Sequence, residues 1–164
     1  MAGRILHRVA RTVARFPVKR YYDTGVLLKL YTPEGDSDRV RAFVRRAGEP
    51  LTFTALHRAE CTSALRLKVF RGEAAESEVI SALRDIDEDV ASGVLHATEL
   101  EWTAALWRCI GLADAHAGTT GCRTLDTLHV SCAATLGARV MVTSDPRQAC
   151  LARKAGLKTV NPMA

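Results

Sequence analysis

Asp126 is an acidic residue in a segment that otherwise has the pattern of a buried helix face. Val130, Ala133 and Gly137 follow it at spacings of four, seven and eleven residues, which places all four on one helical stripe. An acid on a core-facing stripe must be paired, neutralised or bound to a cation, because an unpaired buried charge is very costly. The alternative is that Asp126 lies in the first turn behind a Thr124 cap and interacts only with the helix dipole.

Three further acids raise the same question. Glu60 shares a predicted helical stripe with Leu56 and Leu67, and a glutamate on an apolar stripe is rare unless it is paired. Asp23 and Asp145 each come at the end of a predicted strand. Asp23 could instead close its strand with an Asp-Thr-Gly turn, and Asp145 could be a helix N-cap before a proline.

If these four carboxylates meet at one edge of a sheet, they favour metal-ion chemistry. Each pair at about 4 Å would repel by on the order of 4 kcal/mol at an effective dielectric constant of about 20, and protons or cations must relieve that repulsion. Oxygen ligands without clustered His or Cys favour Mg²⁺ or Mn²⁺ over zinc. One or two such ions can bind a phosphodiester, activate a water and stabilise the leaving oxygen. Phosphodiester hydrolysis is the chemistry best matched to this set.

The elements that must position the acids alternate between short apolar strands and helices. Strands are predicted at residues 18–22, 50–54, 94–97, 139–144 and 158–160. Helices are predicted at residues 26–31, 36–47, 55–70, 76–90, 101–116, 124–137 and 145–156, with a loop at 118–121. This order predicts a mostly parallel sheet flanked by helices, in which ligands bind at the carboxyl ends of the strands.

The composition is that of one soluble globular domain. The 164 residues are 48% hydrophobic and 25% charged, and no apolar run approaches membrane-spanning length. The five cysteines are odd in number and include no C-x-x-C pair, which fits a reducing cytosol better than a disulfide framework. A zinc site at His57 and Cys61 would lack a second ligand pair. We therefore expect a cytoplasmic protein that is not membrane-bound.

The net charge of +5 is concentrated at the amino terminus. Residues 1–20 contain six basic side chains and no acid, so the other 144 residues carry 17 basic and 18 acidic side chains. Residues 1–17 have a basic amphipathic pattern, which could indicate an arm for RNA or membrane surfaces or a targeting segment. An over-extended start or a disordered tail is the favoured interpretation. Residues 18–162 form the predicted domain.

Four segments resemble, in order, the motifs of PIN-domain ribonucleases, most closely those of the VapC-type toxins of toxin–antitoxin pairs. The segments are Tyr22-Asp23-Thr24, His57-Arg58-Ala59-Glu60, Arg123-Thr124-Leu125-Asp126-Thr127-Leu128-His129-Val130 and Thr143-Ser144-Asp145-Pro146-Arg147-Gln148. The resemblance covers about residues 18–162, and its specificity comes from four acids in the matching order.

The resemblance implies a three-layer α/β/α PIN-like fold with a central, mostly parallel sheet of roughly four or five short strands. It implies an endoribonuclease that depends on Mg²⁺ or Mn²⁺ and hydrolyses tRNA or rRNA, a homodimer, and a VapB-like antitoxin as partner. By this comparison Asp23 and Asp126 are the principal metal ligands, and Glu60 and Asp145 complete the catalytic cluster.

Other residues near the motif acids have weaker assignments. Thr24 and Thr143 are expected to support the acids. Four arginines could hold RNA phosphates, although surface or ion-pair roles suit each of them equally well; they are Arg58, Arg66, Arg123 and Arg147. His129 lies one turn after Asp126 and is expected to pack in the core. Trp102 and Trp107 are expected to serve core or dimer packing rather than base stacking.

Two features depart from the family pattern. Gly25 stands where a small hydroxyl residue is common, so a supporting hydrogen bond could be absent, and the basic segment 1–17 precedes the first strand. An aspartic protease built on Asp23-Thr24-Gly25 would need a largely β chain, and a haloacid-type phosphatase would need an acid at position 25. A metal-independent ribonuclease would use His and Lys. The alternative that stays open is a catalytically inactive PIN-like module that binds RNA or a partner.

Overall fold

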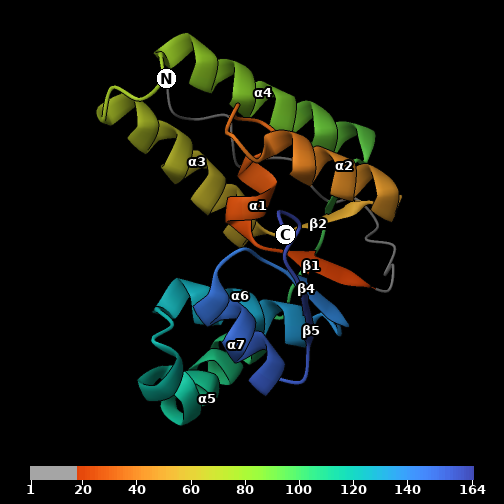
Figure 1. The fold of residues 1–164 in the computed structure, drawn as a ribbon, viewed down its shortest axis with the longest axis vertical. Coiled ribbons are helices and arrows are strands. Elements are labelled where there is room, and N and C mark those ends of the chain that lie inside the picture. Colours follow the sequence, from red (N-terminus) through yellow and green to blue (C-terminus); the bar gives the residue numbers. More distant parts are fainter. Residues whose placement is uncertain (1–17) are drawn as a thin grey trace.

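The computed structural model describes residues 18–164, so the predicted arm at residues 1–17 lies outside the described residues. The described residues form five three-residue strands and seven helices, with one or two helices between successive strands (Figure 1). The strands are β1 (Arg20–Tyr22), β2 (Leu51–Phe53), β3 (Leu95–Ala97), β4 (Val140–Val142) and β5 (Lys158–Val160). The helices are α1 (Thr24–Leu28), α2 (Ser37–Ala47), α3 (Ala55–Phe70), α4 (Glu76–Ser92), α5 (Trp102–Thr120), α6 (Thr124–Thr135) and α7 (Pro146–Lys154).

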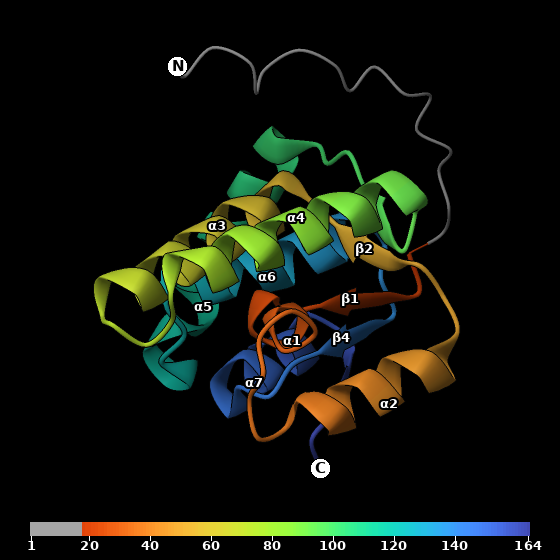
Figure 2. The same ribbon diagram turned by 90° about the horizontal axis from the view of Figure 1, so that it is seen from above.

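All strand pairs are parallel, as the alternation of strands and helices predicts. One sheet has the order β1-β4-β5, and the second pairs β2 with β3. The predicted α/β fold with short parallel strands is confirmed, with the hydrogen-bonded ladder divided between two small sheets. In Figure 1 the strands lie between α2, α3 and α4 above and α5, α6 and α7 below. Helices α3 and α4 run alongside each other in both ribbon views (Figures 1 and 2).

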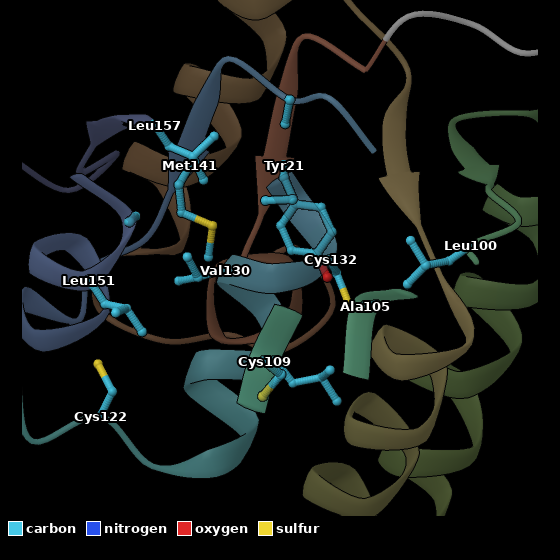
Figure 3. Packing of buried hydrophobic residues seen from close by; sticks show 14 residues of the cluster. Tyr21, Leu100, Ala105, Cys109, Cys122, Val130, Cys132, Met141, Leu151 and Leu157 are labelled. Carbon is cyan, nitrogen blue, oxygen red and sulfur yellow. The ribbon is translucent and has the colours of Figure 1, made fainter. Parts of the chain in front are cut away.

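The three-layer arrangement follows from the alternation of side chains along β1 and β4. Tyr21 and Met141 belong to a core with residues of α5, α6 and α7, whereas Tyr22 and Val142 belong to a core with residues of α1 to α4. Figure 3 shows Tyr21 and Met141 directed toward Val130 and its neighbours. Strands β1 and β4 are therefore covered by helices on both faces, which is the usual condition of a parallel strand.

His57 connects the two sheets where no ladder joins β1 to β2. The backbone N–H of Thr54, the N-cap of α3, donates to His57 Nδ1 at 3.0 Å, and His57 Nε2 donates to the carbonyl of Tyr22 at 2.8 Å. Burial lowers the pKa of His57 to about 3, so the ring is neutral and its two nitrogens have fixed roles. Both ring nitrogens of His57 are already hydrogen-bonded, so neither is free to join Cys61 in binding zinc.

Several predicted boundaries differ from those of the structure, most of all at α5 and α1. Helix α5 continues through Thr120, where a loop was predicted from residue 118, because the hydroxyls of Thr119 and Thr120 donate back to the carbonyl of His116. The helix ends at Gly121, whose φ of 68° is left-handed. Helix α1 begins at Thr24 rather than at residue 26. Among residues 18–164, no helix combines the length and apolar character needed to cross a membrane.

Candidate active site

Asp23 lies at the carboxyl end of β1 and is the centre of the candidate site. Its backbone N–H donates to the carbonyl of Val142 at 2.9 Å, which places it beside the end of β4. The Asp23 side chain is only 18% exposed. Burial raises the pKa of Asp23; the charges of Glu60 and Asp126 raise it further, while His129 and a hydrogen bond from Gln148 oppose these effects. Asp23 therefore lies within electrostatic reach of two of the other predicted acids.

Glu60 reaches the site from α3. Its Oε2 accepts hydrogen bonds from the Thr24 hydroxyl at 2.6 Å and from His129 Nε2. Burial opposes ionisation of Glu60, but the hydrogen bonds from His129 and Thr24 outweigh it, and the pKa of Glu60 lies below its usual value. The predicted supporting role of Thr24 thus has a geometric basis in its contact with Glu60.

The stripe from which Glu60 was singled out is not the buried face of α3. The buried residues of that helix are His57, Cys61 and Leu65, whereas the Leu67 side chain is 43% exposed. Glu60 lies at the edge of the buried face, half-buried, because its carboxylate is directed to the ends of β1 and α6.

His129 packs in the core and also contacts the acids. It is buried, its Nδ1 is 2.9 Å from the Tyr21 hydroxyl, and its Nε2 lies 3.9 Å from Asp23 Oδ1 as well as donating to Glu60. The His129 ring also contacts the rings of Tyr21 and His57. The expected packing role is therefore correct but incomplete, because His129 holds one catalytic candidate and approaches another.

Replacing His129 by leucine is expected to raise the pKa of Glu60 and to lower the free energy of unfolding by about 1–2 kcal/mol. The substitution removes one partner of a charged hydrogen bond. The cost is below that of a fully buried pair because the Glu60 side chain is 23% exposed. Carboxyl NMR titration gives the pKa, and urea denaturation gives the stability. His129→Gln, which can still present an N–H, serves as the control; an unchanged Glu60 pKa in His129→Leu would contradict the assigned contact.

Asp126 lies in the first turn of α6, where its Oδ2 accepts from the backbone N–H of Arg123 at 3.1 Å. Asp126 is thus in the first turn, as the local alternative predicts, but the N-cap is Arg123 rather than Thr124 and the carboxylate bonds its backbone N–H. The carboxylate is also within electrostatic reach of Asp23. Gln148 connects the two segments: its Nε2 lies 3.4 Å from Asp23 Oδ1 and 3.4 Å from the backbone carbonyl of Asp126.

Asp145 is the N-cap of α7, as its position before a proline predicts. Its Oδ1 accepts from the backbone N–H groups of Arg147 at 2.7 Å and Gln148 at 3.3 Å, and its Oδ2 accepts from the Arg147 guanidinium at 3.2 Å. Burial acts against the Asp145 charge, but these bonds outweigh it and the pKa lies below its usual value. The buried hydroxyl of Thr143 accepts from the Asp145 N–H at 3.1 Å, which gives Thr143 a positioning role.

Comparison with known proteins decides which family carries this arrangement. Residues 20–155 match the profile described as PIN domain. The chain belongs to the PIN domain family. PIN domains are generally nucleases, and PIN nucleases typically use divalent metal ions. No curated protein matches the sequence significantly.

A solved structure supports the same fold. The crystal structure of FitAcB from Neisseria gonorrhoeae matches with a TM-score of 0.59 over 87% of this chain and 97% of that chain, at 16% sequence identity. At this identity the likeness concerns the fold. It covers the arrangement of the helices and strands.

The arginines near the PIN motifs are mostly paired with acids. Arg58 pairs with Asp87 and Arg66 with Glu76, both on the outer surface, and Arg147 pairs with Asp145. The fourth, Arg123, is exposed at the start of α6. Three of the four arginines proposed as phosphate contacts therefore have the ion-pair role that was given as their alternative.

The acids of the site match the needs of a divalent ion that keeps most of its waters. Within residues 18–164, no three His, Cys, Asp or Glu side chains stand close enough to hold one ion between them. Mg²⁺ characteristically uses one or two carboxylates and keeps several waters. Asp23 and Asp126 fit that requirement in chemistry and number, and the Glu60 carboxylate accepts hydrogen bonds from Thr24 and His129.

Gly25 bears directly on the carboxylate of Asp23. A Cβ at position 25 would lie 3.2 Å from Asp23 Oδ2, which is tighter than ordinary van der Waals contact. Glycine leaves this oxygen uncrowded. The departure from the PIN motif therefore removes a hydroxyl but keeps the acid accessible.

Three residues of the site were not identified from sequence as site residues: Tyr21, His57 and Gln148. Gln148 belongs to the fourth PIN motif, three residues after Asp145, and its position on the inner face of α7 was the available signal. The roles of Tyr21 and His57 depend on contacts across 108 and 35 residues, which no local pattern contains.

Proposed function

We propose that the chain is an endoribonuclease that depends on Mg²⁺ or Mn²⁺ and acts as the toxin of a toxin–antitoxin pair. The observation that carries the proposal is the position of Asp23. Its carboxylate is buried at a strand end, within electrostatic reach of Glu60 and Asp126, and that setting disfavours the charge unless a cation enters. Membership of the PIN family supports nuclease chemistry, and the resemblance of all four motifs to VapC-type toxins supports the toxin role.

The proposal gives each acid a task. Asp23 and Asp126 would hold the ion. When bound, the ion would stabilise charge on the phosphate and activate the attacking water. Glu60, which Thr24 and His129 keep ionised and oriented, would accept hydrogen bonds beside the scissile phosphate. Asp145, fixed as the cap of α7, would hold Arg147 near Asp126. The pKa of Arg147 is raised, chiefly by its hydrogen bond to Asp145 and also by the charge of Asp126.

The substrate and partners belong to the same proposal. We assign tRNA or rRNA as substrate, a VapB-like antitoxin as inhibitor, and a homodimer of residues 18–162 in the cytoplasm as the acting form. Arg123, exposed next to Asp126, and Arg147 are the candidates for phosphate contacts. Arg58 and Arg66, which pair with surface acids, have weaker support.

Removing the metal is expected to abolish cleavage. The full chain is incubated with total tRNA and rRNA in Mg²⁺, in Mn²⁺ and in EDTA, and the products are resolved by denaturing electrophoresis. We expect cleavage with either ion, none in EDTA, and recovery when the ion is restored. Cleavage in EDTA would contradict the proposal and favour a metal-independent ribonuclease.

Two other results would change parts of the proposal. Tight RNA binding without cleavage in either ion would favour the inactive binding module. Growth arrest on expression, relieved by the product of a small adjacent gene, tests the toxin role separately from the chemistry.

A further inference from the structure

Gln148 joins the two segments that carry the principal acids. It lies on α7 and is 1% exposed, and its Nε2 is 3.4 Å from Asp23 Oδ1 and 3.4 Å from the backbone carbonyl of Asp126. One amide group thus spans the gap between the end of β1 and the first turn of α6. Among residues 18–164, Gln148 is the one side chain that hydrogen-bonds to both of these residues.

The other end of the Gln148 amide has no partner. Two acceptors on one side fix the NH₂ group there, so Oε1 faces the opposite way, where it is buried without a hydrogen-bond donor among the described residues. A buried polar atom without a partner destabilises a fold, whereas an apolar side chain of the same size would pack without that cost. Packing alone does not account for a glutamine at this position.

We propose that Gln148 is a positioning residue for the divalent ion: it holds the Asp23 carboxylate against the first turn of α6, so that Asp23 and Asp126 face the ion together. This inference rests on the proposed function. The residues that orient metal ligands typically affect metal affinity by about 10–100-fold when removed. Gln148 contacts the carboxylate of Asp23 and the backbone carbonyl of Asp126. Residues that orient metal ligands usually contact the ligands in this way.

The test compares Gln148→Met with Thr135→Val. Met is close to Gln in size and shape but has no amide, so it removes both the contact to Asp23 and the unpartnered Oε1. Thr135 is a matched control, because its Oγ1 is also buried without a partner, at the far end of α6 from Asp126. Mn²⁺ affinity of the full chain is measured by EPR detection of free Mn²⁺, and Tm is measured in EDTA.

Thr135→Val is expected to melt at or above the Tm of the wild-type chain, because it loses an unpartnered buried atom. In Gln148→Met the loss of the unpartnered Oε1 offsets the loss of the two Nε2 hydrogen bonds, so its Tm in EDTA is expected to stay close to that of the wild type. Gln148→Met is expected to bind Mn²⁺ about tenfold more weakly, and Thr135→Val is expected to bind as the wild type does. A Gln148→Met affinity within roughly twofold of the wild type would overturn the inference, since the tenfold loss taken from comparable positions would be missing. A Gln148→Met chain that fails to fold would overturn it too, by showing that the amide is required for packing. A wild-type chain that does not bind Mn²⁺ would instead contradict the proposed function.

Discussion

Replacing Asp126 by asparagine is expected to lower the rate of RNA cleavage by on the order of a thousandfold. Asparagine keeps an oxygen that can accept from the backbone N–H of Arg123, so the first turn of α6 retains its cap. The substitution removes the negative charge that the proposed ion requires. Losing about 4 kcal/mol of metal-dependent stabilisation corresponds to a rate loss of this size.

The measurement is single-turnover cleavage of total tRNA or rRNA in Mg²⁺, with Tm recorded for each variant. Asp38→Asn is the matched control, because Asp38 also lies in the first turn of a helix, α2, but its side chain is 97% exposed and pairs only with Arg41. We expect Asp38→Asn to cleave at the wild-type rate. Unchanged cleavage by Asp126→Asn would eliminate Asp126 as a metal ligand and with it the proposed site.

The acids at the strand ends could be predicted from sequence because their positions depend on local pattern and chain order. A short apolar strand followed by an acid, repeated along an alternating α/β chain, places Asp23 and Asp145 at one edge of a parallel sheet. The cap of Asp145 follows from its place before Pro146 and is present as predicted. Glu60 was predicted from a helical stripe with Leu56 and Leu67, and the structure shows that Leu67 is exposed. Glu60 nevertheless lies near Asp23, so the position was predicted correctly although the stripe is not the buried face.

The contacts that shape the site could not be predicted in the same way. His129 was expected to pack in the core because an apolar helix surrounds it, and only the fold brings Glu60 and Tyr21 to its two nitrogens. Gln148 was overlooked because a polar residue on a short surface helix is ordinarily solvated. Its burial becomes evident only when α7 is placed against α6 and the end of β1.

His57 is expected to make the fold lose stability as the pH falls below about 6.5. The pKa of His57 is lowered to about 3 from its usual value of 6.5, chiefly by burial, with the nearby His129 acting in the same direction. The unfolded chain therefore binds a proton in this range that the folded chain does not. The contribution is fully present above pH 6.5 and decreases by about 1.4 kcal/mol per pH unit below it, which is about 2 kcal/mol between pH 6.5 and pH 5.

The window from pH 6.5 to pH 5 lies above the range in which the carboxylates with lowered pKa values lose their contributions. Glu60 and Asp145, whose pKa values are lowered, lose their contributions only at lower pH, and Asp23, whose pKa is raised, acts in the opposite direction. Urea denaturation of the metal-free chain at several pH values gives the slope for the wild type.

His57→Gln provides the control for this slope, because Gln three residues after a Thr N-cap is an ordinary capping-box residue and can still accept from the Thr54 N–H. The variant has no group that titrates at this position, so the difference in slope between it and the wild type measures His57 alone. Equal slopes would mean that the His57 ring accepts a proton inside the fold. That result would be incompatible with a ring whose Nδ1 accepts from Thr54 while its Nε2 donates to Tyr22, and the link between the two sheets would need another explanation.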